Sequence, residues 1–276
     1  GKEYVRMISP PSLQNLDEIY PIPELPSEIK DAVSNGKLVV FIGAGASRII
    51  GCSGWKALAE HLVDACFKNK RINYWEQERL KTNDPRKTIS ILKTVMGQAD
   101  YEKVLEVSLQ AKPDLLEKFP IYSHLIKLRS IYITTNIDTY FDSFFEQPRI
   151  YIEPSQFKTE NLARNTLFKL HGSMTVHKTV IFTTQDYISH YNRRDVKTFL
   201  EGLFGGEYTV LFVGYSLAEL EILDYVLLKG DAEKSQSTTL KESKHFLLLP
   251  FYGSEKGLLR FERAYFDTLN VITVPY

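Results

Sequence analysis

Four short segments of this sequence bring small or polar residues to positions where chemistry could occur: 43–47, 136–138, 171–173 and 214–217. Each directly follows an apolar or β-branched run of the kind that forms a buried strand, at 38–42, 131–135, 166–170 and 209–213. The carboxyl ends of parallel strands meet at one edge of a sheet, where ligands of α/β proteins bind. We therefore expect the four segments to converge on one cleft.

The first segment reads Gly-Ala-Gly-Ala-Ser and has almost no side-chain bulk. We interpret it as a turn whose backbone lies against a ligand, of which a dinucleotide diphosphate is typical. A helix predicted to begin at about Gly54 and Trp55 would aim its N–H groups into the same cleft. Arg48 stands where a dinucleotide fingerprint has its third glycine, so this segment alone is weakly specific.

The second and third segments carry the reactive side chains. Asn136 and Asp138 could contact a ligand, or could cap a helix that we predict to run through Phe145. His171, between an apolar run and Gly172, could act as a general base or be a satisfied core histidine; the setting favours catalysis. For the other histidines we expect surface or helix-face positions: His61, His124, His177, His190 and His245.

The order of the elements predicts an α/β fold, a Rossmann-like doubly wound and mostly parallel sheet. A helical subdomain is inserted at about 55–128, with breaks at 83–85, 97 and 113. We expect an extended, proline-rich leader over 1–27 and a single folded domain over 28–276. Further strands are predicted at 149–152, 179–183, 245–250 and 271–274, further helices at 27–34, 186–191, 195–204, 219–228 and 258–269, and a mobile polar segment at 229–244.

Composition limits the class of protein. The 34 basic and 34 acidic residues balance, so the basic excess of a duplex-binding protein is absent and we expect no direct contact with nucleic acid. No apolar run is long enough to span a bilayer, so we expect no membrane contact. Two cysteines, Cys52 and Cys66, are too few for a tetrahedral zinc site and favour a reducing, cytoplasmic location.

Three motifs, in order and at strand ends, carry a family resemblance: GAGAS at 43–47, TTNID at 134–138 and LHGS at 170–173. They resemble the GAG-x-S, T-Q-N-I-D and H-G signatures of the sirtuin (SIR2) superfamily, and VGYSL at 213–217 resembles a later loop of that family. The resemblance spans about 37–274 and implies NAD⁺ as the ligand.

The resemblance also implies a role for each matching residue. His171 would be the general base, and Asn136 and Asp138 would contact the nicotinamide and its ribose. The dinucleotide itself would be bound by two sets of residues. The diphosphate would lie against Gly43, Ala44, Gly45 and Ser47, and the adenosine half against Gly214, Ser216 and Leu217.

Departures from the family pattern point to one branch of it. Deacylase sirtuins carry four zinc-binding cysteines, and this chain has two in total; Thr135 also replaces the glutamine of T-Q-N-I-D. The sequence is more similar to the SIR2-like domains of bacterial anti-phage defence proteins, which hydrolyse NAD⁺ to nicotinamide and ADP-ribose. That resemblance implies no zinc, a homo-oligomer, and a fused or separate sensor or partner protein.

Two alternatives stay open at this point. A protein deacylase or ADP-ribosyltransferase would release nicotinamide only when its acceptor peptide is present. A non-enzymatic sensor of NAD⁺ or ADP-ribose would bind the dinucleotide and leave it intact.

Overall fold

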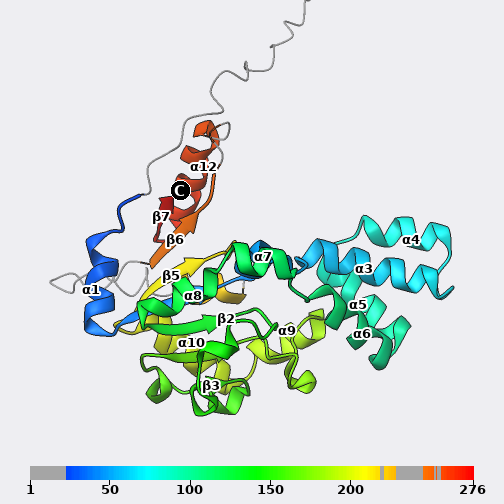
Figure 1. The fold of residues 1–276 in the computed structure, drawn as a ribbon, viewed down its shortest axis with the longest axis horizontal. Helices are drawn as coiled ribbons and strands as arrows, with labels where there is room; N and C mark the ends of the chain where they lie inside the picture. The colour runs from blue at the N-terminus through cyan, green and yellow to red at the C-terminus, as the bar shows by residue number, and fades with distance from the viewer. Residues whose placement is uncertain (1–22, 218–220, 228–244, 252, 254–255) are drawn as a thin grey trace, which may run out of the picture.

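The computed structural model describes residues 23–276 apart from 218–220, 228–244, 252 and 254–255, and contains a seven-stranded sheet in the order β3-β4-β2-β1-β5-β6-β7. Every paired neighbour is parallel, so the predicted doubly wound α/β fold is confirmed (Figure 1). The strands are β1 Leu38–Ile42, β2 Ile131–Thr134, β3 Ile150–Tyr151, β4 Thr166–Lys169, β5 Thr209–Val213, β6 His245–Leu249 and β7 Val271–Pro275.

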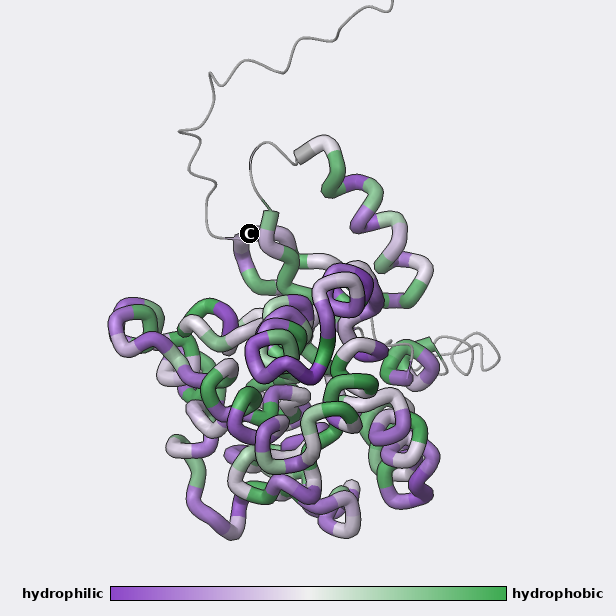
Figure 2. The backbone as a smooth tube through the Cα atoms, turned by 90° about the vertical axis from the view of Figure 1, so that its right-hand side faces the viewer, coloured by the Kyte–Doolittle hydropathy of each residue, from purple (hydrophilic) through white to green (hydrophobic). Residues whose placement is uncertain are grey.

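Strand β1 is the centre of this sheet. It pairs with β2 on one side and β5 on the other, and all five of its residues are buried. Alternate side chains enter different cores: Val39 and Phe41 pack into one cluster, and Leu38, Val40 and Ile42 into the other. Hydrophobic segments accordingly run through the interior of Figure 2. We name these the Phe41 face and the Val40 face of the sheet.

Helices fill the whole connection between β1 and β2. Four of them, α3 to α6, pack around a third apolar cluster that includes Leu62, Ile89 and Leu105, and lie beside the sheet in Figure 1. The predicted breaks are confirmed: Asp84 caps α5, Gly97 has a φ of +79°, and Pro113 begins α7. The helices are α3 Trp55–Lys68, α4 Tyr74–Lys81, α5 Pro85–Met96, α6 Gln98–Ser108, α7 Pro113–Lys118 and α8 Ile121–Leu125.

The remaining helices cover the sheet and its edges, and residues 221–227 are helical as well. Along α12, hydrophobic and hydrophilic turns alternate (Figure 2). No helix among the described residues is long and apolar enough to cross a membrane. These helices are α1 Ser27–Asn35, α2 Ala44–Ile49, α9 Thr184–Tyr191, α10 Arg194–Gly205 and α12 Lys256–Thr268.

Three local predictions were wrong. The Gly-Ala-Gly-Ala-Ser segment is not an extended turn, because helix α2 begins at Ala44, directly after β1. No α-helix follows Asp138; the chain makes only a 3₁₀ turn at Asp142–Phe144. The β-branched run 179–183 is not a strand, since Thr183 instead caps α9 in a reciprocal capping box with Asp186.

Two predicted segments fall largely outside the described residues. The leader is described only from residue 23, immediately before α1, and the polar segment 229–244 is not described at all. The boundaries of the leader, the folded domain and the helical insertion therefore stay predictions.

Candidate active site

The glycines of the first motif lie against the backbone of another motif. Gly43 N–H donates to Val213 O at 2.9 Å, and Gly45 N–H donates to Gly214 O at 2.7 Å. A Cβ on Gly43 would lie 2.6 Å from Gly214 O, and a Cβ on Gly45 would lie 2.7 Å from Gly214 Cα. The lack of bulk at 43 and 45 therefore lets the start of α2 pack on the loop after β5.

The loop after β5 is held by the same contact. Gly214 has a φ of +60°, and a Cβ there would lie 2.6 Å from the backbone nitrogen of Ala46. Leu217 is buried with a φ of +51°, a left-handed conformation that is costly for a residue with a γ-branched side chain. Ser216 is exposed. Tyr215 packs its ring on Phe41, with ring centroids 5.0 Å apart. The predicted adenosine-side residues thus form one ordered turn beside α2.

Ser47, Asn136 and Asp138 form one hydrogen-bonded group. The Ser47 hydroxyl donates to Asp138 Oδ2 at 2.6 Å, and Asn136 Nδ2 donates to Ser47 Oγ at 2.8 Å and to Gly43 O at 2.9 Å. The Tyr122 hydroxyl of α8 lies 2.8 Å from the same Ser47 oxygen, and burial raises the pKa of Tyr122 far above its usual value. Four side chains from three parts of the chain therefore meet at Ser47. We call them the Ser47 group.

A buried ion pair supports the loop that carries this group. The Lys169 side chain, at the end of β4, is fully buried and lies 2.8 and 3.0 Å from the two carboxylate oxygens of Asp142. Its ammonium also donates to the backbone oxygen of Asp138. Burial raises the pKa of Asp142, and the facing ammonium opposes that rise. Lys169 thus fixes both the start and the end of the 138–142 segment.

His171 is enclosed by aromatic residues of α9. Its Nε2 lies 2.8 Å from the Tyr191 hydroxyl and its Nδ1 lies 3.3 Å from the Tyr187 hydroxyl. The side chain is only 2 % exposed. Burial lowers the pKa of His171 well below 6.5, and the charges of His190 and Arg86 act in the same direction. The imidazole is therefore neutral at physiological pH, the state a general base requires. We call His171, Tyr187 and Tyr191 the His171 group.

The sheet register brings the two groups to the same edge. Strands β2 and β4 pair with Thr134 beside Lys169, so the residues that follow each strand are neighbours. Backbone bonds continue the contact past the strand ends, from Leu170 N to Thr134 O at 2.8 Å and from Met174 N to Ile137 O at 3.0 Å. The predicted convergence of the segments that follow β1, β2, β4 and β5 is what the topology produces.

Several residues of the site were not found from the sequence. Tyr187 and Tyr191 lay within a predicted helix, where their four-residue spacing places both on one face. Lys169 carried a signal that could have been used, since a lysine inside an apolar strand must have a buried partner. Nothing in the sequence around Tyr122 indicated that it belongs to the site.

The prediction for the remaining histidines was partly wrong. His190 is on a helix but buried, and burial lowers its pKa to about 4. His245 is buried in β6, where its Nδ1 lies 3.3 Å from the backbone nitrogen of Val210. His177 lies near the surface and its Nδ1 is 3.1 Å from a carboxylate oxygen of Glu102.

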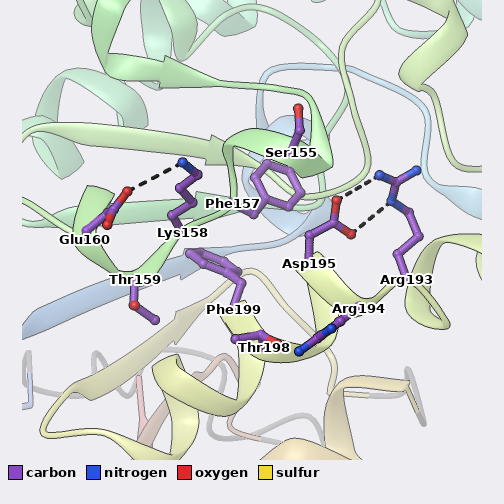
Figure 3. Close-up of a pocket in the computed structure, with 10 residues that line it drawn as sticks. All are labelled: Ser155, Phe157, Lys158, Thr159, Glu160, Arg193, Arg194, Asp195, Thr198 and Phe199. Atoms are coloured by element: carbon purple, nitrogen blue, oxygen red, sulfur yellow. Dashed lines mark hydrogen bonds and ion pairs between the residues drawn. The ribbon is translucent and has the colours of Figure 1, made fainter.

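A cavity of about 780 Å³ lies between α10 and the 3₁₀ turns at Pro154–Gln156 and Thr159–Asn161 (Figure 3). Four of the charges in its lining form two ion pairs, Arg193 with Asp195 and Lys158 with Glu160. None of the predicted site residues lines it.

Within the described residues no cluster of three or more histidine, cysteine, aspartate or glutamate side chains could hold a metal ion. Cys52 and Cys66 are both buried as free thiols, and burial raises the pKa of Cys52 to about 12.

Comparison with known proteins gives the family. The model of the SIR2-like domain family matches residues 130–270, just over half of the 276 residues, and the chain belongs to that family. The matched region holds Asn136, Asp138, His171 and the loop after β5, whereas the glycines of α2 precede it.

One relative is Defense-associated sirtuin 2 of Bacillus subtilis, 25 % identical over 205 residues. The match covers 71 % of this chain and 19 % of that protein, so the chain spans about a fifth of the relative's length. The resemblance to the SIR2 superfamily is thereby confirmed, and both findings agree with the α/β fold.

Proposed function

We propose that this chain is an NAD⁺ glycohydrolase that cleaves NAD⁺ to nicotinamide and ADP-ribose and acts in defence against phage. One observation carries the proposal: a neutral, buried histidine and a hydrogen-bonded Asn–Ser–Asp group lie at the carboxyl ends of adjacent parallel strands. Such an edge is where a doubly wound sheet binds nucleotides. Support for the defence role comes from the similarity to Defense-associated sirtuin 2.

The substrate would lie across the edge of the sheet. The start of α2 offers backbone N–H groups. Those of Gly43 and Gly45, however, already donate to the backbone oxygens of Val213 and Gly214. Ala46 N–H is also used, because it donates to Gly43 O at 3.2 Å. The diphosphate would therefore be held mainly by the positive end of the helix dipole. The loop at 214–217 would border the adenosine half, and Asn136 and Asp138 would face the nicotinamide ribose.

The chemistry needs one base and a site that shields the developing charge. The C1′–N bond breaks, and its electron pair leaves with neutral nicotinamide. A water oxygen bonds to C1′ and loses a proton to His171, so the products are nicotinamide, ADP-ribose and one proton. General-base help of this kind contributes typically ~10²–10⁴-fold in rate. Asp138 would stabilise the positive charge that develops on the ribose.

The test is product analysis with a matched histidine control. Purified protein is incubated with NAD⁺, and nicotinamide and ADP-ribose are separated by chromatography. We expect His171→Ala to lower the rate by about 10²–10⁴-fold and Asn136→Ala to lower it as well. His124→Ala, which changes an exposed histidine on α8, should leave the rate unchanged. Equal rates for wild type and His171→Ala would contradict the proposal.

A second function is favoured by one feature of the site. Both ring nitrogens of His171 are hydrogen-bonded within the protein, an arrangement also suited to a site that binds NAD⁺ without cleaving it. Calorimetric titration with NAD⁺, followed by recovery of the ligand, separates the two functions. Tight binding with NAD⁺ recovered intact after long incubation would identify a sensor. Nicotinamide release that depends on an added acyl-lysine peptide would identify a deacylase.

Control of the activity is also a proposal. We infer that a homo-oligomer, and a fused or separate sensor or partner protein, regulate the site in the cytoplasm. The relative is about five times as long as the matched share, which leaves room there for such a region. NAD⁺ levels in cells that express the full-length protein, with and without phage, would test this.

A further inference from the structure

The imidazole of His171 has a hydrogen-bond partner at each nitrogen. Nε2 is 2.8 Å from the Tyr191 hydroxyl and Nδ1 is 3.3 Å from the Tyr187 hydroxyl. A neutral imidazole has one N–H donor and one acceptor nitrogen, whereas a hydroxyl can play either part. One tyrosine must therefore donate to the ring while the other accepts from it.

The two distances decide which tyrosine donates. A phenol is a far more acidic donor than a neutral imidazole N–H, so the stronger and shorter bond is the one in which the phenol donates. That is the 2.8 Å bond from the Tyr191 hydroxyl to Nε2. The longer contact is then the donation from Nδ1–H to the Tyr187 hydroxyl. The geometry gives His171 a proton on Nδ1 and a lone pair on Nε2.

Helix α9 holds both tyrosines rigidly. Tyr187 and Tyr191 are four residues apart, their rings stack with centroids 5.9 Å apart, and both are buried. The start of the helix is fixed by the capping box of Thr183 and Asp186. The Tyr187 hydroxyl, which accepts from Nδ1–H of His171, is therefore held in place by the packing of the helix.

Helix α5 of the insertion fixes α9 in turn. The Arg86 guanidinium lies 3.7 Å from the centroid of the Tyr187 ring, and its Nη1 donates to Glu221 at 2.9 Å. Ser90 Oγ accepts from the backbone nitrogen of Thr184 at 2.9 Å. A chain of direct contacts thus leads from the helical insertion, through Tyr187, to the ring of His171.

We propose that Tyr187 and Tyr191 are positioning residues that keep His171 neutral, in its Nδ1–H tautomer, with Nε2 as the basic nitrogen. Arg86 acts one step further out by fixing the Tyr187 ring. Nε2 is then the nitrogen that takes the proton of the attacking water, while Nδ1–H stays bonded to the Tyr187 hydroxyl. This inference rests on the proposed NAD⁺ hydrolysis for its catalytic consequence, and on the His171 contacts for the tautomer.

The first measurement does not depend on turnover. Two-bond ¹H–¹⁵N spectra of protein labelled at histidine report the protonation of each ring nitrogen, and His171→Gln assigns the His171 signals. We expect a neutral Nδ1–H ring from pH 8 down to pH 6. In Tyr187→Phe the His171 ring should become a mixture of tautomers, because Nδ1–H has lost the Tyr187 hydroxyl as an acceptor. Wild-type signals of an Nε2–H ring, or of an ordinary titration near pH 6.5, would overturn the inference.

The second measurement uses the reaction. Tyr187→Phe and Tyr191→Phe should each lower kcat on the order of 10- to 100-fold, as for other residues that orient a functional histidine, with KM for NAD⁺ little changed. Tyr101→Phe is the matched control, since that hydroxyl is equally buried and has no hydrogen-bond partner among the described residues. It should leave kcat and the His171 signals unchanged.

The outcomes separate this inference from the proposed function. If wild type hydrolyses NAD⁺ and both tyrosine variants match it, the positioning role is wrong and the hydrolase stands. If the spectra show the Nδ1–H ring but wild type leaves NAD⁺ intact, the tyrosine hold is confirmed and the hydrolase is wrong. Circular dichroism of each variant establishes that it is folded before either conclusion is drawn.

Discussion

The Ser47 group and the His171 group are both buried and polar, and both follow the ends of central strands, yet they are built differently. Tyr122 packs in the core of the Val40 face, whereas Tyr187 and Tyr191 pack in the core of the Phe41 face. The first group contains a carboxylate and rests on the Lys169–Asp142 ion pair. The second contains a neutral imidazole held by two phenols.

This difference matches the tasks that the two groups would have. The carboxylate of Asp138 would lie beside the ribose, with the buried Lys169 ammonium bonded to the backbone oxygen of the same residue. A base must instead stay neutral until it receives its proton, and an apolar aromatic enclosure favours that state. In the proposed reaction, one face of the sheet would supply charge and the other would supply the base.

The largest expected effect tests the dependence of the Ser47 group on charge. Lys169→Met leaves Asp142 unpaired and removes the donor to Asp138 O, so we expect a loss of about 3 kcal/mol in the free energy of unfolding. This loss is at the lower end of the cost of breaking a buried ion pair, because the Asp142 side chain is partly exposed to solvent. Urea unfolding measures the loss. The His171 ring signals should not change, because that group uses neither charge.

The double variant Lys169→Met/Asp142→Asn is the control for this change. It removes the stranded carboxylate as well, so part of the lost stability should return. If the free energy of unfolding of Lys169→Met lies within about 0.5 kcal/mol of wild type, the ion pair does not stabilise this segment.

The two groups also differ in how far the sequence could predict them. Asn136, Asp138 and His171 lie within a few residues of strand ends, and the strands are short runs rich in apolar or β-branched residues, so the sheet and these positions followed from local pattern. The hydrogen-bond partners of His171 could not be predicted from such a local pattern. Tyr187 and Tyr191 reach it only because α9 folds back under α5, a tertiary contact that leaves no short-range trace.

The glycine motif shows the same limit at shorter range. Its small residues correctly indicated a close backbone approach, but the approaching backbone is that of Gly214 rather than only a ligand. The segment 43–47 also contains the start of helix α2, which its lack of side-chain bulk did not indicate, and Gly and Ser are weak helix formers. Packing against the loop after β5 overrides that preference.

A smaller effect is expected when the hydroxyl at the centre of the Ser47 group is removed. Ser47→Ala deprives Asp138, Asn136 and Tyr122 of a shared partner, so we expect a loss of about 1–3 kcal/mol in the free energy of unfolding. Ser143→Ala, at an exposed serine, should stay within about 0.5 kcal/mol. If Ser47→Ala is as stable as that control, water replaces the hydroxyl and the group is less closed than the contacts indicate.

The effect that is smallest at neutral pH, and grows as the pH falls, concerns the His171 group. His190 is buried beside His171, with ring centroids 6.3 Å apart, and burial lowers its pKa to about 4. Between pH 6.5 and pH 4 the unfolded chain therefore binds a proton that the folded His190 does not. Stability from this residue is complete above pH 6.5 and falls as the pH drops, by up to about 1.4 kcal/mol per pH unit.

His190→Gln removes that share of the slope while keeping a polar side chain of similar size. Urea unfolding of wild type and variant at several values between pH 4.5 and pH 7 measures the difference, in which the contributions of carboxylates such as Asp142 cancel. We expect the variant to gain on wild type as the pH falls. Parallel curves would mean that His190 takes up its proton in the folded protein at the same pH as in the unfolded chain. A second charge would then lie beside the base, and the aromatic enclosure would not be the neutral environment that distinguishes it from the Ser47 group.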